Sequence, residues 1–168
     1  MTDTGRLIRR LVLIAVLTAL LETAKFALNA IANVELITLL VIVLTRKYGG
    51  KIMLAVVMLF TVLETMWWGL SIWTATYFYV WPVLVLLTVL FRKQDSVLFW
   101  SILSAFYGLF FGALCSLTTL VVGGWQAAVA WWIAGIPYDL IHCAANFVIC
   151  LLLYRPLTKA LEHIRLSV

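Results

Sequence analysis

Residues 83–94 read VLVLLTVLFRKQ, an unbroken apolar run that ends on a pair of basic side chains. The run does not alternate polar and apolar residues, as a strand of a transmembrane barrel would. It belongs to an apolar stretch over about 75–91, which suits a membrane-crossing helix because roughly 20 apolar residues span the hydrocarbon. Arg92 and Lys93 then mark the end of this helix that stays on the cytoplasmic side.

Similar apolar runs occur on both sides of this stretch. Of the 168 residues in the chain, 65% are hydrophobic and 11% are charged. A small soluble domain cannot hide such an apolar excess in its core. We therefore expect an all-α integral membrane protein in which residues 1–168 form a single transmembrane domain, with no cleavable signal peptide. The second run is short, so we expect its helix to be tilted or sheltered by others. The apolar runs cover about 7–30, 33–46, 51–70, 75–91, 97–121 and 126–153.

The net charge of +5 does not indicate a nucleic-acid partner, because the basic residues cluster at the ends of apolar runs. Clusters occur before the first run, between the second and third, between the fourth and fifth, and after the sixth. The other junctions, NAIANVE, GLSIWTAT and VVGGWQ, carry no Lys or Arg. This alternation predicts six transmembrane helices with both termini in the cytoplasm. All basic residues except Lys25 fit it: Arg6, Arg9, Arg10, Arg46, Lys47, Lys51, Arg92, Lys93, Arg155, Lys159 and Arg165.

The chain lacks the motifs of metal sites and enzymes. Cys115, Cys143 and Cys150 are odd in number, lie in apolar runs and match no zinc or redox spacing, so we interpret them as small buried residues. There is no HExxH, no paired-His metal spacing and no nucleophile motif. We expect no catalytic residues, no metal and no cofactor.

Several ionisable residues interrupt the apolar runs. An ionised side chain at bilayer depth costs at least ~2.5 kcal/mol, so these residues usually face protein or a water-filled cavity. Glu22, Lys25 and Asn29 are spaced by three and four residues and therefore share one face of the first helix. The others are Glu35, Glu64 and Asp139.

The sixth run carries a similar polar stripe within IPYDLIHCAANF, residues 136–147. Three interpretations are open: an interhelical hydrogen-bond network in which Asp139 pairs with Lys25, a ligand cavity open to the outside, or a proton relay or catalytic site. We expect His142 to lie deep and to support helix packing. Whether the whole stripe touches ligand or only packs helices stays open. Its members are Trp132, Gly135, Asp139, His142 and Asn146.

Aromatic residues gather on the predicted outer side. They suit an interfacial belt, or a stacking wall for a large planar or amphipathic ligand. Combining this wall with the polar stripes gives an outward cavity as the candidate binding site. The candidate substrate-binding residues are Lys25, Asn29, Asn33, Glu64, Trp67, Trp68, Trp132, Tyr138 and Asp139.

Two ridges of small residues at four-residue steps predict close helix contacts. The ridge Ser104, Gly108, Gly112 and Ser116 most simply packs inside the domain. The ridge Ala15, Ala19, Thr23 and Ala27 lies about a quarter turn from the Glu22–Lys25–Asn29 stripe. If that stripe faces inward, the alanine ridge faces sideways or toward lipid, where it suits a partner helix or internal packing.

These features together resemble the S component, the substrate-binding membrane subunit, of energy-coupling factor (ECF) vitamin transporters. The resemblance covers nearly the whole chain and rests on size, six helices with both ends inside, the AVLTA segment at residues 15–19 and the closing GIPYDLIHCAANFVICLLLYRPL. The AVLTA segment looks like the family's AxxxA contact motif, which implies that Ala15 and Ala19 meet the coupling subunit.

The resemblance implies capture of a vitamin from outside a bacterial cytoplasmic membrane. It also implies partners, namely a membrane coupling subunit and two ABC-type ATPases; the chain itself has no ATPase phosphate loop. NVELITLLVIVL and the tryptophans look most like the cobalamin branch, although a smaller aromatic vitamin suits the same wall nearly as well. Two alternatives stay open: a small secondary transporter or channel that uses the intramembrane acids, and a scaffold subunit that binds no ligand.

Overall fold

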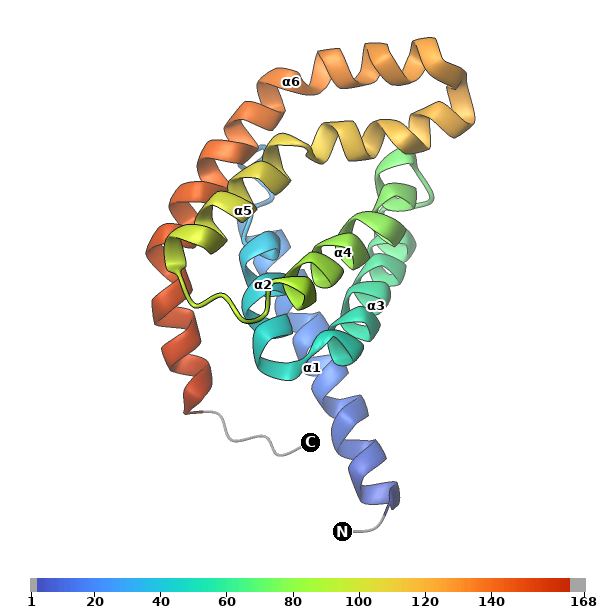
Figure 1. The fold of residues 1–168 in the computed structure, drawn as a ribbon. Helices are drawn as coiled ribbons and strands as arrows, with labels where there is room; N and C mark the ends of the chain where they lie inside the picture. The colour runs from blue at the N-terminus through green and yellow to red at the C-terminus, as the bar shows by residue number, and fades with distance from the viewer. Residues whose placement is uncertain (1–2, 164–168) are drawn as a thin grey trace.

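The computed structural model describes residues 3–163, and every regular element within them is an α-helix. The prediction of an all-helical chain is confirmed for this part. Figure 1 shows the helices grouped into one bundle, with the first turns of the N-terminal helix projecting from it. In chain order the helices are α1 (Asp3–Leu28), α2 (Ile37–Tyr48), α3 (Gly50–Trp68), α4 (Ile72–Leu90), α5 (Val97–Leu109) and α6 (Phe111–Glu162).

The long α6 consists of two legs that run in opposite directions. Gly124 has φ 78° and ψ 179°, which are not helical angles, and the chain reverses there (Figure 1). Glycine adopts this positive φ without the Cβ clash that other residues meet. We call residues 111–123 the outward leg and residues 125–162 the return leg. The reversal lies in VVGGWQ, where the sequence predicts the break between the fifth and sixth runs.

Four stretches among the described residues are long and apolar enough to cross a membrane. They are α1, α3, α4 and the continuous stretch Val97–Glu162, which includes the reversal at Gly124. These stretches fit a multi-pass membrane protein. The count of six crossings and the position of the termini in the cytoplasm stay predictions.

The short α2 is enclosed by the other helices. All residues from Ile37 to Thr45 are buried, and α2 contacts α1, α3, α4, α5 and α6. A helix that is apolar on every face is stable only when it is surrounded, which explains why the run ITLLVIVL shows no polar stripe. The expectation that this helix is sheltered is confirmed.

Local signals fix where the central helices begin and end. Gly49 (φ 86°) closes α2 with an amide that donates to the Thr45 carbonyl at 2.9 Å, and α3 starts at the next residue. Ser71 and Thr74 form a reciprocal capping box at the start of α4. Ser96 caps α5 by accepting from the Phe99 amide at 3.3 Å. These caps satisfy amides that helix starts otherwise leave unpaired.

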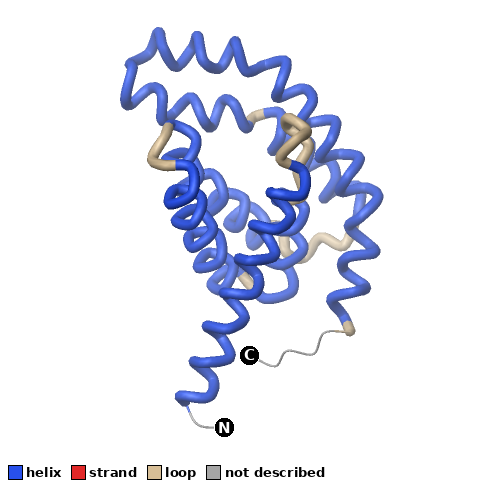
Figure 2. Tube along the Cα trace, turned by 180° about the vertical axis from the view of Figure 1, so that it is seen from behind, coloured by secondary structure: helices blue, strands red, loops and turns tan. Residues whose placement is uncertain are grey.

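The basic junctions gather at one end of the bundle. The α2–α3 junction, the α4–α5 connection and both ends of the described chain lie together (Figures 1 and 2). The Arg46 guanidinium donates to the Tyr154 hydroxyl and, at 2.7 Å, to Asp95. The connections at 29–36 and 69–71 and the reversal at Gly124 lie at the other end. We call these the basic end and the opposite end.

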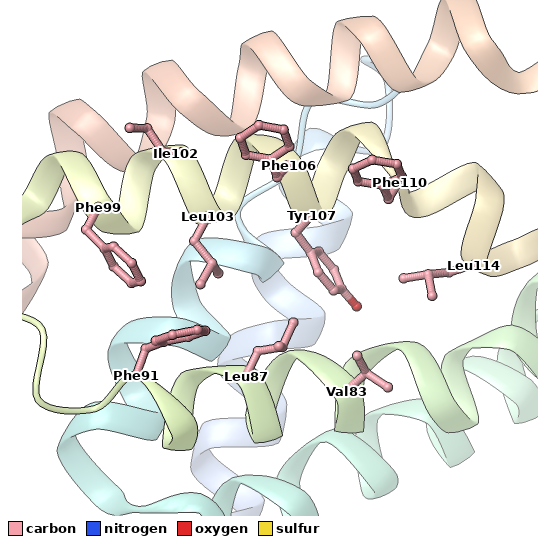
Figure 3. A pocket seen from close by; sticks show the side chains of 10 residues that line it. All are labelled: Val83, Leu87, Phe91, Phe99, Ile102, Leu103, Phe106, Tyr107, Phe110 and Leu114. Carbon is pink, nitrogen blue, oxygen red and sulfur yellow. The ribbon is translucent and has the colours of Figure 1, made fainter.

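An apolar groove runs along the side of the bundle between α4 and α5 (Figure 3). Its volume is about 470 Å³. The Tyr107 hydroxyl donates to the Val80 carbonyl at 2.6 Å, so it is not free to bind a ligand in the groove. Such a surface suits contact with lipid chains. It is lined by Val83, Leu87, Phe91, Phe99, Ile102, Leu103, Phe106, Tyr107, Phe110 and Leu114.

Cysteine labelling tests the predicted orientation. On a background without the native cysteines, Leu70→Cys and Val122→Cys at the opposite end should react with an impermeant thiol reagent added to intact cells. Lys47→Cys and Gln94→Cys at the basic end should react only after permeabilisation. All four side chains are exposed, so burial does not limit the reaction. The reverse pattern of labelling would contradict the cytoplasmic placement of the basic end.

Candidate ligand cavity

A cavity of about 190 Å³ lies at the opposite end, where the chain leaves α1 and enters α2. Its wall combines the C-terminal turn of α1, the connection at 29–36, two aromatic residues of α4 and the first residue of α6. It brings together three predicted site residues, Lys25, Asn29 and Asn33. The remaining lining residues are Leu28, Ile31, Ala32, Val34, Glu35, Ile37, Tyr77, Trp81 and Phe111.

A buried ion pair joins this cavity to α3. The Lys25 ammonium donates to the Glu64 carboxylate and, at 3.3 Å, to the Tyr77 hydroxyl. The Glu64 side chain is 1% exposed and that of Lys25 is 24% exposed, so Lys25 supplies the face that meets the cavity. The pair that we considered between Asp139 and Lys25 is therefore wrong, because Glu64 takes the ammonium.

The Lys25 ammonium also contacts an aromatic ring. Its nitrogen lies 4.7 Å from the centre of the Tyr77 ring, whose face carries partial negative charge. Taking an ion pair out of water costs free energy, which the attraction offsets only if the geometry is good and other groups replace the lost hydrogen bonds. Tyr77 replaces one of them, whereas Glu64 Oε1 is buried without a partner.

Glu35 forms the opposite side of the cavity and ties three elements together. One carboxylate oxygen accepts from the Thr38 amide at 2.8 Å, which satisfies a donor in the first turn of α2. The other lies 3.2 Å from His142 Nε2 on the return leg. The His142 ring in turn packs edge-on against Phe111, with 5.1 Å between ring centres. Glu35 thus holds the connection at 29–36 against α2 and α6.

Aromatic rings close the cavity from the side of α4. Trp81 lies 5.4 Å from Tyr77 and 5.8 Å from Phe111 between ring centres, and both pairs are inclined rather than parallel. Trp81 is 3% exposed, and its indole N–H is buried without a hydrogen-bond partner. An unpaired buried donor is costly, so a ligand acceptor at this wall would be favoured.

The polar stripe of the return leg packs against α5 and the outward leg. Asp139 accepts from the Gly112 amide at 3.0 Å, and the Asn146 amide donates to the Ser104 carbonyl at 3.5 Å. Asp139, His142 and Asn146 are all buried. The part of the stripe from Asp139 to Asn146 therefore faces the bundle interior as predicted and serves the interhelical network, whereas Trp132 at its outer end is exposed. Asp139 does not line the cavity, although it was a candidate binding residue.

The same contact explains the ridge of small residues. A Cβ at Gly108 would lie 2.9 Å from the carbonyl carbon and oxygen of His142, and a Cβ at Gly112 would overlap the Asp139 carboxylate. The ridge therefore packs inside the domain, as the sequence predicts. At Gly108 only a hydrogen leaves room for the backbone of the return leg, whereas a side chain at Gly112 would displace the Asp139 carboxylate.

Four predicted binding residues lie on the surface, away from the cavity. Trp67 and Trp68 are exposed at the end of α3, where both rings contact Phe26 of α1. Trp132 and Tyr138 are exposed on the return leg. Their exposure at the opposite end is typical of an aromatic belt at a membrane interface. None of the four lines the cavity.

Four lining residues, Glu35, Tyr77, Trp81 and Phe111, were not among the predicted binding residues. Tyr77 and Trp81 are four residues apart and so share a helix face, a spacing that could have singled them out among the outer aromatics. Glu35 precedes Thr38 by three residues, a spacing found at helix starts. Phe111 has no such signal, because it resembles every other aromatic in its run.

The alanine ridge of α1 is exposed along its whole length. Ala15, Ala19, Thr23 and Ala27 all lie on the outer surface, whereas Leu13, Leu17, Leu21 and Ala24 face the bundle. The ridge therefore lies on the outside of the bundle, while Glu22 and Lys25 of the polar stripe are half-buried and Asn29 is exposed. Within residues 3–163 the ridge is exposed, so it leaves a smooth face on which a lipid or a partner helix could pack.

Two further features concern cysteines and metals. Cys115 and Cys150 are buried, Cys143 is half-buried, and all three are free thiols. No group of three or more His, Cys, Asp or Glu side chains in residues 3–163 is arranged to hold a metal ion.

Comparison of the chain with protein-family models, with curated proteins and with solved structures found no match. The class of protein therefore follows from the fold alone: an all-helical chain whose long apolar helices fit several membrane crossings.

The Lys25–Glu64 pair should be needed as a unit. Lys25→Met leaves the Glu64 carboxylate buried without a cation, and we expect a loss on the order of 3 kcal/mol in unfolding free energy. Lys25→Met combined with Glu64→Leu removes both charges and should restore most of that loss. Unfolding by denaturant in detergent measures both variants. A double variant as unstable as the single one would contradict this account.

Gly108 and Gly135 offer a matched test of the helix contact. Gly108→Ala should destabilise the protein by about 1–3 kcal/mol, because the new methyl group meets the His142 backbone. Gly135→Ala meets nothing within 4 Å and should be neutral or stabilising by up to about 1 kcal/mol. Thermal unfolding in detergent compares the two. Equal tolerance of both substitutions would show that the return leg packs less closely than described.

Proposed function

We propose that the protein is the substrate-capture subunit of an ATP-driven importer of the ECF type. In this role it binds a vitamin-sized molecule from outside and passes it inward with a coupling subunit and two ATPases. The proposal joins the resemblance in sequence to a cavity whose lining carries charged, amide and aromatic groups. It is not an enzyme in this proposal, since the cavity presents binding groups without a nucleophile–base pair.

The observation that carries the proposal is the position and lining of the cavity. It lies at the end that the positive-inside rule assigns to the outside, which is where an uptake protein meets its substrate. Lys25 and Glu35 supply opposite charges, and the Trp81 ring supplies an aromatic wall whose enclosed indole N–H has no hydrogen-bond partner among the described residues. Ligand sites combine an apolar wall with a few polar groups in this way.

The size of the cavity favours a small ligand. Sites for drug-sized molecules span roughly 300–1,000 Å³, and this cavity of about 190 Å³ lies below that range. A corrinoid would require the connection at 29–36 to move outward. The volume therefore favours a small aromatic or amphipathic vitamin over cobalamin.

The exposed ridge of α1 supports the coupling part of the proposal. Ala15 and Ala19 leave a smooth strip along a transmembrane helix, and small residues at this spacing allow a second helix to approach closely. A coupling subunit that packs there would not cover the cavity lining on α1, because Lys25 and Leu28 lie on another face of this helix.

The two alternative functions make different demands. A secondary transporter needs an ionisable path through the bilayer, whereas Lys25, Glu64, Glu35 and His142 gather beside the cavity. A scaffold needs no cavity. Purification separates the three, because only an ECF-type subunit should co-purify with a coupling subunit and ATPases.

Substitution of Trp81 tests whether the ligand binds in the proposed cavity. The ligand is first identified by mass spectrometry of small molecules retained after mild purification. Trp81→Phe keeps an aromatic ring but removes the indole N–H, so we expect affinity to fall by about 0.5–1.5 kcal/mol. Calorimetric titration gives the value. Trp132→Phe is the control and should bind as tightly as the unaltered protein. If Trp132→Phe weakens binding and Trp81→Phe does not, the site lies elsewhere.

Ala15 and Ala19 test the coupling surface. Ala15→Leu with Ala19→Leu adds bulk to the exposed ridge, so we expect uptake to be lost while the isolated subunit still binds its ligand. Ala134→Leu adds the same bulk to an exposed position of the return leg and should leave uptake intact. Persistent uptake in the double variant would exclude the ridge as the docking surface.

A further inference from the structure

A second hollow, strongly basic, lies at the basic end of the bundle. It is a cleft of about 730 Å³ between the N-terminal turns of α1 and the junction of α2 with α3. Four cationic side chains from two separate parts of the chain line it, Arg6 and Arg10 from α1 and Lys47 and Lys51 from the junction. The other lining residues within 3–163 are Leu7, Tyr48, Gly49, Gly50 and Ile52, and none of them carries a carboxylate.

The backbone explains why the four cations converge. Arg6 and Arg10 are four residues apart and therefore share one face of α1. Gly49 takes a positive φ of 86° between the two junction helices, so the last turn of α2 and the first turn of α3 meet beside the same hollow. Lys47 and Lys51 are brought together by that sharp turn.

The cations of this cleft are largely unsatisfied. Within residues 3–163, the side chains of Arg10, Lys47 and Lys51 form no ion pair or hydrogen bond, and Arg6 pairs only with the exposed Asp3 at 2.5 Å. Arg46, at the same end, is by contrast held by Tyr154 and Asp95 and lies over the Trp100 ring. The cleft therefore gathers positive charge that the described chain does not neutralise.

We propose that this cleft binds the phosphate headgroup of an anionic phospholipid. The N-terminal part of α1 is exposed and apolar next to the cleft, at Leu7, Ile8 and Leu11, which gives the acyl chains a surface to lie along. Basic pockets between membrane helices on the cytoplasmic side hold anionic headgroups through this combination of charge and apolar contact. A zwitterionic lipid fits less well, because its own cation would meet four others.

A soluble anion could supply the same phosphate group to the cleft. A free phosphate or phosphate ester makes the ionic contacts but has no chains to lie on α1. The lipid assignment therefore requires that the acyl chains add to binding, and this requirement separates the two sources.

Native mass spectrometry of the detergent-purified full-length protein tests the proposal. The protein is mixed with equal amounts of phosphatidylglycerol and phosphatidylcholine, and the retained lipid is counted. We expect phosphatidylglycerol to be preferred. Lys47→Gln with Lys51→Gln should reduce its retention on the order of tenfold, since each basic residue near a membrane surface contributes separately. Arg155→Gln with Lys159→Gln removes the same charge from exposed positions of α6 and should change retention little.

The proposal would be overturned by equal retention of both lipids by the unaltered protein, by an equal loss in both double variants, or by displacement of phosphatidylglycerol by equimolar inorganic phosphate. Thermal unfolding of each variant without added lipid checks that the cleft variant is folded. A cleft variant that folds normally and retains phosphatidylglycerol fully also contradicts it.

Discussion

The close contact between the return leg of α6 and the helix formed by α5 and the outward leg organises the rest of the structure. Gly108 and Gly112 remove the side chains that would hold the two legs apart, and the Gly112 amide binds Asp139. This contact fixes the position of His142 along the bundle, and His142 meets Glu35 at the start of α2. A single helix packing thereby places Phe111 in the cavity wall and anchors the connection at 29–36.

The pairing of two carboxylates, Glu64 and Glu35, explains the position of the cavity. Glu64 is fully enclosed by protein, and it is tolerable there because the Lys25 ammonium reaches it from α1 and is itself held by Tyr77. Glu35 is held by His142 and the Thr38 amide. Both paired sites border the cavity, so the two charged groups of its lining, Lys25 and Glu35, are already fixed by their partners. Such preorganisation lowers the cost of ordering groups on binding.

The sequence correctly predicted which residues share the polar and small-residue faces. It did not predict which of these residues line the cavity and which pack helices or lie on the surface. Lys25, Asn29 and Asn33 meet at the cavity, but Trp132 and Tyr138 are exposed and Asp139 serves helix packing. Helical spacing tells which residues share a face, whereas it does not tell which face of a neighbouring helix lies opposite. For this reason the pairing of Lys25 with Glu64, rather than with Asp139, could not be derived from spacing.

The sequence by itself determined the helical class, the sheltered position of α2, the reversal at VVGGWQ and the outward alanine ridge of α1. These features follow from apolar run length, periodicity and glycine placement, which act locally along the chain. Only the tertiary structure decided which ionisable groups pair and which aromatics enclose the cavity. Tyr77, Trp81 and Phe111 come from two helices and resemble the exposed tryptophans in composition. Their difference arises from which side of each helix is buried, and that depends on the packing of all six helices together.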